Sequence, residues 1–302
     1  MTTIGLVGAG AMGSALGANW VAGGQSVLTC LTGRSPRTRD LATRAGLGTV
    51  TTLDQLVNAS DLVVSVVPPV SAVEAAQSVA NAARRTTARP LVADLNAISP
   101  GTVERVRTVL TAVGCELVDG SISASPPRAG GEPATVYVSG SRARSFAALS
   151  SPWLDVVVLD GPVGAASALK MCTASMYKGV KALVLAALLT AEAHGVREQF
   201  LADVARVWPE DVPRWHTDVA VATAKAWRFV EEMREISRTQ EGVGLPPELF
   251  DGVAALYTYA TYAAATPLGR TPLEALDRSA AVEEVLAGLR GEPGVPARDA
   301  GG

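Results

Sequence analysis

The amino-acid sequence predicts an α/β protein in which a doubly wound parallel sheet is followed by an all-α C-terminal domain. In the first half, short apolar runs alternate with segments of helical composition. A glycine-rich turn follows the first of these runs directly, and after about residue 160 the runs give way to long stretches of helix formers. Continuous apolar strands separated by helices are typical of a parallel sheet that is covered on both faces.

The expected strands are the apolar runs of the first half, namely Thr3–Val7, Ser26–Leu31, Thr49–Val50, Asp61–Val67, Leu91–Leu95, Glu116–Asp119 and Thr135–Ser139. The expected helices of this half are Ala11–Ala22, Pro36–Ala45, Ala72–Ala83 and Thr102–Ala112. Because a crossover between parallel strands is almost always right-handed, this alternation predicts one sheet with helices on both faces.

The second half is expected to be helical. Ser167–Ala193 contains no proline and a single glycine, and it is apolar on nearly every side, so we expect a long helix buried between domains or subunits. Further helices are expected at Glu198–Val207, Pro213–Ile236, Pro247–Ala265 and Thr271–Leu289. The predicted domains are 1–162 for nucleotide binding and 163–290 for substrate binding and dimerisation, with a disordered Gly/Pro-rich tail at 291–302.

Bulk properties narrow the class of protein. The chain has 302 residues, 48% of them hydrophobic, and a formal net charge of −3, which gives no electrostatic reason to expect nucleic acid or an anionic membrane as a partner. Three scattered cysteines indicate a reducing compartment, and neither a signal peptide nor a metal-ligand spacing is seen. The apolar stretch Gly179–Ala193 is short for a membrane span. We therefore expect a soluble cytoplasmic protein.

The glycine-rich turn has the pattern G-x-G-x-x-G, directly after a strand and at the start of a helix. Gly8 permits the tight turn, Gly10 lets the backbone approach a pyrophosphate, and Gly13 lets helix and strand pack closely. The backbone N–H groups at Ala11 and Met12 belong to a helix N-terminus, which favours anions. This context predicts a Rossmann dinucleotide-binding domain, whereas the pattern alone would also fit an ordinary glycine-rich turn.

The end of the second strand predicts which dinucleotide is bound. An acidic residue that holds the ribose 2′-hydroxyl of NAD is expected about 20 residues past the glycines. Arg34 and Ser35 occupy this place instead, and an arginine with a hydroxyl suits the 2′-phosphate of NADP. The alternative is that Arg34 is an ordinary solvated loop residue. We expect NADP, with NADPH as its reduced form.

The N-terminal half resembles the β-hydroxyacid dehydrogenases, the group that includes 3-hydroxyisobutyrate and 6-phosphogluconate dehydrogenases. The resemblance rests on five stretches, which begin at Gly5, Val66, Asp94, Asp119 and Gly161. It implies that Val67 and Pro68 flank the cofactor and that Asn96 lies beside the nicotinamide and the substrate. A helix-capping role just ahead of Ser99 is the alternative for Asn96. The resemblance also implies that Ser121, Ser123 and Ser125, which we expect just after a strand end, bind the substrate carboxylate, with Ser123 close to the reacting groups. The C-terminal part resembles an uncharacterised domain type that follows such domains.

The fifth stretch ends at Lys170, and the resemblance implies that this lysine transfers the proton of the reaction. Thr173 and Ala174 stand where the family usually has an asparagine, so Thr173 is our candidate for orienting the substrate oxygen. Tyr177 lies one helical turn further along the same stripe and is expected to line the substrate site. The alternative for Lys170 is a solvated lysine on an amphipathic helix.

These observations predict an NADP-dependent oxidoreductase that acts on a small hydroxyacid-like substrate. An imine reductase is the second hypothesis, and Lys170 argues against it because imine reductases usually have Asp or Tyr there. A non-catalytic NADP-binding protein is the third. The apolar helices favour a homodimer, since one small helical domain would struggle to cover them.

Overall fold

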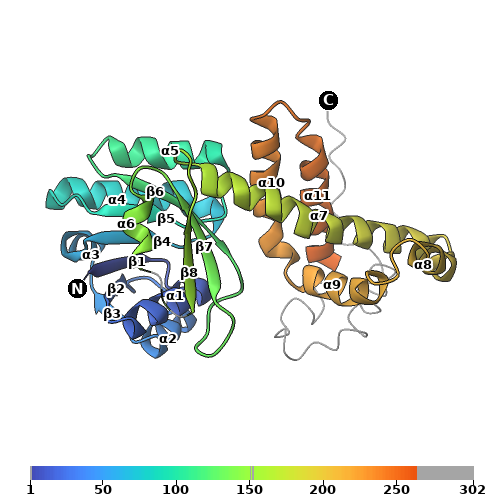
Figure 1. The fold of residues 1–302 in the computed structure, drawn as a ribbon, viewed down its shortest axis with the longest axis horizontal. Coiled ribbons are helices and arrows are strands. Elements are labelled where there is room, and N and C mark those ends of the chain that lie inside the picture. Colours follow the sequence, from blue (N-terminus) through green and yellow to red (C-terminus); the bar gives the residue numbers. More distant parts are fainter. Residues whose placement is uncertain (1, 150, 152, 264–302) are drawn as a thin grey trace. The chain divides into compact units, whose positions relative to one another are not determined.

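The computed structural model describes residues 2–149, 151 and 153–263. The predicted helix Thr271–Leu289, the end of Pro247–Ala265 and the tail at 291–302 lie outside the described residues. The chain divides into two compact units, of which the first ends at Cys172 and the second begins at Thr173. Figure 1 shows an α/β first unit and a helical second unit, as the sequence predicts.

The first unit is built on one eight-stranded sheet with the strand order β3-β2-β1-β4-β5-β6-β7-β8. All neighbouring strands pair in parallel except β6 and β7. The order reverses between β1 and β4, which creates the crevice where open α/β sheets bind ligands. The strands are β1 Thr3–Val7, β2 Ser26–Cys30, β3 Gly48–Val50, β4 Leu62–Ser65, β5 Leu91–Asp94, β6 Leu117–Ser123, β7 Ala134–Ser139 and β8 Leu154–Val158.

The far edge of the sheet differs from the sequence prediction. The strand expected to end at Asp119 runs on to Ser123, and β7 then pairs antiparallel with it. No helix connects β6 to β7, and without such a crossover the chain can only return antiparallel. The strand β8 was not predicted; only its first residue, Leu154, is buried, and the other four are exposed or partly exposed.

Helices cover both faces of the sheet in the first unit (Figure 1). Three of them start at a hydroxyl side chain that accepts a backbone N–H, namely Ser35, Thr52 and Ser99. Neither α3 nor α6 was predicted, because both are too short for a clear helical period. The helices are α1 Ala11–Ala22, α2 Pro36–Arg44, α3 Leu53–Ala59, the 3-10 turn η1 Pro69–Ser71, α4 Ala72–Thr86, α5 Pro100–Thr111 and α6 Ala143–Ala147.

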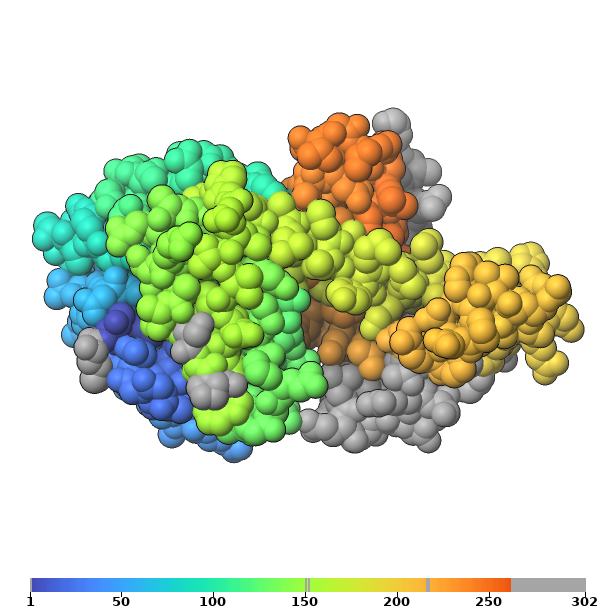
Figure 2. All heavy atoms as spheres, viewed as in Figure 1, coloured from blue at the N-terminus to red at the C-terminus, as the bar shows by residue number. Residues whose placement is uncertain are grey.

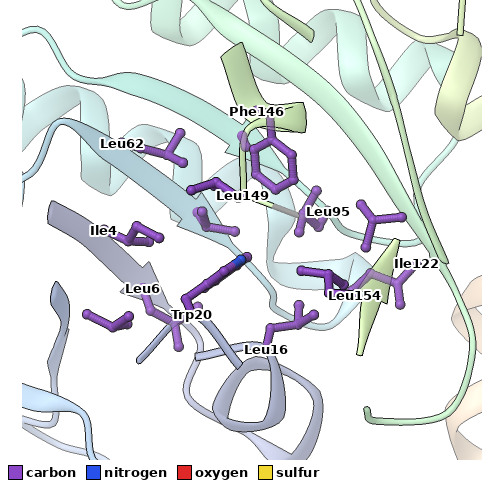
Figure 3. Close-up of a cluster of buried hydrophobic side chains, with 14 of the residues drawn as sticks. Ile4, Leu6, Leu16, Trp20, Leu62, Leu95, Ile122, Phe146, Leu149 and Leu154 are labelled. Atoms are coloured by element: carbon purple, nitrogen blue, oxygen red, sulfur yellow. The ribbon is translucent and has the colours of Figure 1, made fainter. Parts of the chain in front are cut away.

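Two apolar cores lie on opposite faces of the sheet. In β4, Leu62 and Val64 belong to one core and Val63 to the other, as the two-residue period of a strand requires. Figure 3 shows the first core, where Trp20 of α1 meets Phe146 of α6 edge to face with ring centroids 6.4 Å apart. Burial on both faces explains why these strands read as unbroken apolar runs.

The second unit contains most of the long helix α7 Ala165–Ala193, followed by α8 Arg197–Ala205, α9 Val212–Ala224, α10 Ala226–Glu241 and α11 Glu248–Ala263. The single helix predicted at Pro213–Ile236 is wrong, because the backbone leaves helical geometry at Lys225, with φ −111° and ψ 3°. Nothing in the residue types at this point signals a break, since helix formers flank Lys225 on both sides.

One face of the helix α7 is exposed in the single chain, and its burial between subunits stays a prediction. Large apolar side chains in its middle are exposed, and Figure 2 shows this part of the helix in yellow-green on the surface. By length and composition alone α7 is long enough to cross a membrane. Within the helical unit, Lys178 and Lys181 of this helix form ion pairs with Glu232 and Asp218.

Candidate dinucleotide and proton-transfer site

The glycine turn between β1 and α1 is a position where side chains do not fit. Gly8 has φ +102°, and a Cβ there would lie 2.1 Å from the carbonyl oxygen of Val66. A Cβ on Gly13 would lie 2.1 Å from the carbonyl oxygen of Gly8, whereas a Cβ on Gly10 would meet nothing within 4 Å. Gly8 and Gly13 therefore let the turn pack closely beside Val66, just after β4, and Gly10 leaves open space in front of the backbone.

The N-terminus of α1 is suited to an anion. Gly10 is the N-cap residue, no side chain caps this end, and the first backbone bond of the helix runs from Ser14 N to Gly10 O at 2.8 Å. The N–H groups of Ala11, Met12 and Gly13 precede that bond and have no partner within the helix. Together with the helix dipole, they fit the pyrophosphate of a dinucleotide.

A cavity of about 260 Å³ lies at the carboxyl ends of β1, β2 and β4, at the point where the strand order reverses. Its lining includes Gly8, Arg34, Val67 and Pro68, four residues that the sequence assigns to the cofactor. Ser35 does not line this cavity. Its hydroxyl instead accepts the Thr38 N–H at 3.2 Å and caps α2.

Asn96 is held by the protein in a way that its sequence motif does not reveal. The side chain is 2% exposed, and its Oδ1 accepts the backbone N–H of Val67 at 2.6 Å. Its Nδ2 donates to the Asp94 carboxylate at 2.8 Å and to the Ser65 hydroxyl at 3.1 Å. Asn96 therefore joins β5 to the loop that lines the cavity, rather than presenting its amide to open space.

Asp94 is fully buried beneath this amide. Desolvation raises the pKa of its carboxyl to about 7, with a further rise from the negative Asp119, its register neighbour on β6. The bonds from the Asn96 backbone and side chain oppose this rise. Asp94 is a titratable group of the site that sequence reasoning missed, and its only signal was an acidic residue at the end of an otherwise apolar strand.

The structure brings Lys170 of α7 to strand β6. Its Nζ donates to the carbonyl oxygen of Ile122 at 2.9 Å, and the side chain is partly buried. Ser121 and Ser123 flank Ile122 along the strand, Ser121 buried and Ser123 exposed. These two serines lie within β6, so the expectation that they follow a strand end is wrong. Ser125 lies in the exposed loop beyond.

Asp119 fixes the start of α7, a function that sequence reasoning also missed. Its carboxylate is fully buried and accepts the backbone N–H groups of Gly164 at 2.9 Å and Ser167 at 3.1 Å. The hydroxyl of Ser167 lies 2.6 Å from the same carboxylate, and that of Ser139 lies 2.9 Å from it. One strand thus holds both the first turn of α7 and, one turn later, the Lys170 ammonium.

The remaining predicted residues lie further along α7. Thr173 is partly buried three positions after Lys170, while Tyr177 is 71% exposed. The predicted stripe of Lys170, Thr173 and Tyr177 is therefore partly buried at its first two residues and exposed to solvent at its last. Within the described residues, no cluster of three or more His, Cys, Asp or Glu side chains has the arrangement of a metal site.

A reversed strand order beside a glycine turn and an uncapped helix defines a dinucleotide-binding protein with the fold of the nicotinamide-dependent oxidoreductases. Residues 3–156 match the NAD binding domain of 6-phosphogluconate dehydrogenase, and the chain belongs to that family. Residues 191–259 match DUF1932, a domain of unknown function. The sequence resemblance and the uncharacterised C-terminal domain type are both confirmed.

Solved structures of similar fold include dehydrogenases and reductases. A conserved protein of unknown function, described as structurally similar to 3-hydroxyacid dehydrogenases, is 28% identical, with a TM-score of 0.65 and coverage of 85% of this chain and 97% of the other. The Mycobacterium tuberculosis 3-hydroxyisobutyrate dehydrogenase shares 22% identity, with a TM-score of 0.65 and coverage of 94% and 98%. An imine reductase from Streptomyces aurantiacus shares 18%, with a TM-score of 0.54 and coverage of 94% and 99%.

Proposed function

We propose that this protein is an NADP-dependent dehydrogenase or reductase. It moves a hydride between the nicotinamide and the hydroxyl or carbonyl carbon of a small hydroxyacid-like substrate, with Lys170 as general acid and base. The observation that carries the proposal is the position of the Lys170 Nζ, 2.9 Å from Ile122 O on the strand that bears Ser121 and Ser123. These residues belong to the same compact unit as the glycine turn.

The chemistry requires a hydride acceptor and a proton acceptor. The nicotinamide ring supplies the first when bound, by taking a hydride from carbon or returning it. Lys170 supplies the second, because its neutral amine takes the hydroxyl proton during oxidation and its ammonium returns a proton during reduction. The ammonium form also polarises a carbonyl oxygen. The hydrogen bond to Ile122 O holds the amine in place between these two states.

The substrate contacts follow from the side chains around this amine. Ser123, exposed at the end of β6, and Ser125 in the next loop offer hydroxyl donors to a carboxylate. Ser121 is 2% exposed, so its hydroxyl is less accessible to a substrate than those of Ser123 and Ser125. Thr173 follows Lys170 by one turn of α7 and is our candidate for orienting the reacting oxygen, and Tyr177, one turn further, stays a predicted substrate contact.

The preference for NADP is inferred from the end of β2. Arg34 lines the cavity beside Thr32, in the place where NAD-binding domains carry an acidic residue for the ribose. A guanidinium in this position grips a 2′-phosphate with two hydrogen bonds. Within the described residues Cys30, Cys115 and Cys172 form no disulfide, and we propose a reducing compartment such as the cytoplasm.

The second candidate function is reduction of a C=N bond, which the likeness to imine reductases in fold supports. Turnover of a panel of small hydroxyacids and cyclic imines with NADP+ or NADPH separates the two. We expect oxidation of at least one hydroxyacid, dependent on Lys170. Imine reduction that is unaffected by Lys170→Ala would instead favour the second function. Binding of NADPH without turnover of any panel member would favour a non-catalytic NADP-binding protein.

A further inference from the structure

We propose that Asp94 and Asn96 form a positioning pair that fixes the Val67–Pro68 wall of the dinucleotide cavity, and thereby sets the affinity for the cofactor without touching it. The inference rests on the proposed binding of a nicotinamide dinucleotide in this cavity. It assigns Asn96 a different function from the direct cofactor contact that the sequence suggests.

The loop after β4 needs an external acceptor. Val66 N still donates to Val7 O at 2.8 Å, as part of the sheet, but Pro68 has no N–H to donate. Within the Val67–Pro68 wall, the Val67 N–H is therefore the single backbone donor. It donates to Asn96 Oδ1 at 2.6 Å. Without this bond, a partly buried N–H would have to seek water by moving the loop.

The orientation of the Asn96 amide is set by Asp94. Asp94 Oδ2 accepts the NH₂ group of Asn96 at 2.8 Å, so the nitrogen end of the amide faces this carboxyl group. The backbone N–H of Asn96 donates to the other oxygen of this carboxyl group at 3.0 Å, so both oxygens of Asp94 are held by Asn96. The amide oxygen is then left facing Val67. A flipped amide would set an NH₂ group against the Val67 N–H.

A movement of this wall would reach the phosphate-binding turn. The Gly8 backbone lies so close to the loop that a Cβ on Gly8 would sit 2.1 Å from Val66 O and 3.0 Å from Val67 Cγ1. A shift of Val67 toward Gly8 would therefore displace the phosphate-binding turn. Since Gly8, Val67 and Pro68 all line the cavity, the pair controls a surface that a dinucleotide contacts.

The decisive experiment exchanges the two side chains. Asn96→Asp sets two buried carboxylates against each other, and we expect the Kd for NADPH to rise about tenfold with a matching increase in Val67 amide exchange. The double variant Asp94→Asn with Asn96→Asp exchanges the amide and the carboxylate. The NH₂ group at position 94 then donates to the carboxylate at position 96, whose other oxygen accepts the Val67 N–H. We expect this exchange to return both quantities to within about threefold of wild type.

Asn81→Asp on α4, whose Oδ1 accepts from Gln77 and Arg84, should change neither quantity. If Asn96→Asp does not fold, Ser65→Ala removes only the 3.1 Å bond and should raise the Kd about twofold. A wild-type Kd for NADPH in these variants would overturn the positioning pair alone. So would a double variant that binds NADPH as weakly as Asn96→Asp does. A wild-type chain that binds neither NADPH nor NADH would overturn the proposed function as well.

Discussion

At the scale of single residues, we propose that Arg34 determines the choice between NADP and NAD. Replacing Arg34 with alanine should raise the Kd for NADPH by about 10- to 100-fold, because one charge-assisted bidentate contact contributes about 1.5–3 kcal/mol. The Kd for NADH should change less than about twofold. Fluorescence titration of both cofactors measures this, with Arg37→Ala on the exposed side of α2 as the control. Equal weakening of both cofactors would contradict the assignment of Arg34 to the 2′-phosphate.

Asp94 makes the stability of the fold depend on pH. Burial raises the pKa of its carboxyl from 3.8 to about 7, so between these values the folded protein holds a proton that the unfolded chain has released. The free energy of unfolding should therefore fall as pH rises from about 4 to about 7, and Asp94 should contribute no further change above that. At about 1.4 kcal/mol per pH unit, the fall amounts to about 4 kcal/mol.

Urea denaturation at pH 5 and pH 8 measures this contribution. Asp94→Asn should lose most of the difference between the two pH values, because the amide does not titrate. Asp155→Asn, which changes an exposed carboxylate on β8, should keep the wild-type difference. An Asp94→Asn protein with an unchanged difference would show that other groups cause the pH dependence.

At the scale of elements, strand β6 holds the N-terminal end of α7. Asp119 on this strand accepts the first backbone N–H groups of the helix, and Ile122 accepts Lys170 one turn later. Asp119→Ala leaves those buried N–H groups without an acceptor and should reduce the free energy of unfolding by about 2–4 kcal/mol. It should also lower kcat, because α7 is no longer fixed in rotation.

The comparison for this prediction is Ser99→Ala, which removes an ordinary helix cap from α5. We expect a loss of about 1 kcal/mol and no change in kcat for that variant. Denaturant titration and steady-state kinetics measure both effects. An Asp119→Ala protein that loses no more stability than Ser99→Ala, or that keeps the wild-type kcat, would argue against this anchoring function.

The elements that the sequence predicted well are those whose signal is local. The buried strands β1 and β4, the glycine turn and the long helix α7 each follow from a continuous pattern of residue types. The break at Lys225, the antiparallel return of β7 and the short helix α6 depend instead on tertiary contacts. No single window of sequence contains those contacts.

The same distinction holds in the candidate site. The positions of Gly8 and Arg34 follow from spacing along the chain, and both line the cavity. The bond from Asn96 to Val67 joins residues 29 positions apart, and the bond from Ser167 to Asp119 joins residues 48 apart. Such partners are brought together only by the sheet register, so their roles become apparent only once the strands are assembled.

At the scale of the whole molecule, we propose that a second copy of the chain covers the exposed face of α7. Met176, Val180 and Leu183 are 66%, 46% and 63% exposed and recur at helical spacing, beside the exposed Tyr177. A contiguous apolar stripe on a protein surface marks an interaction surface, and twofold dimers are the commonest soluble oligomers.

Sedimentation velocity tests the dimer. The wild-type chain should sediment as a dimer at micromolar concentration, and Leu183→Glu should shift it to a monomer because a carboxylate cannot be buried there without a partner. Val243→Glu, at a residue 74% exposed in the turn after α10, should leave the dimer intact. A monomeric wild-type chain would rule out this assembly.

The central claim is that Lys170 transfers the proton of a nicotinamide-dependent reaction. The most direct measurement compares kcat and the Kd for NADPH in Lys170→Ala with those in Lys181→Ala, a lysine of the same helix that pairs with Asp218. With a turned-over substrate, Lys170→Ala should lower kcat by about 10²- to 10⁴-fold and leave the Kd for NADPH within about twofold of wild type. Lys181→Ala should leave kcat within about threefold of wild type. If Lys170→Ala kept the kcat of the wild-type enzyme, the claim would be wrong.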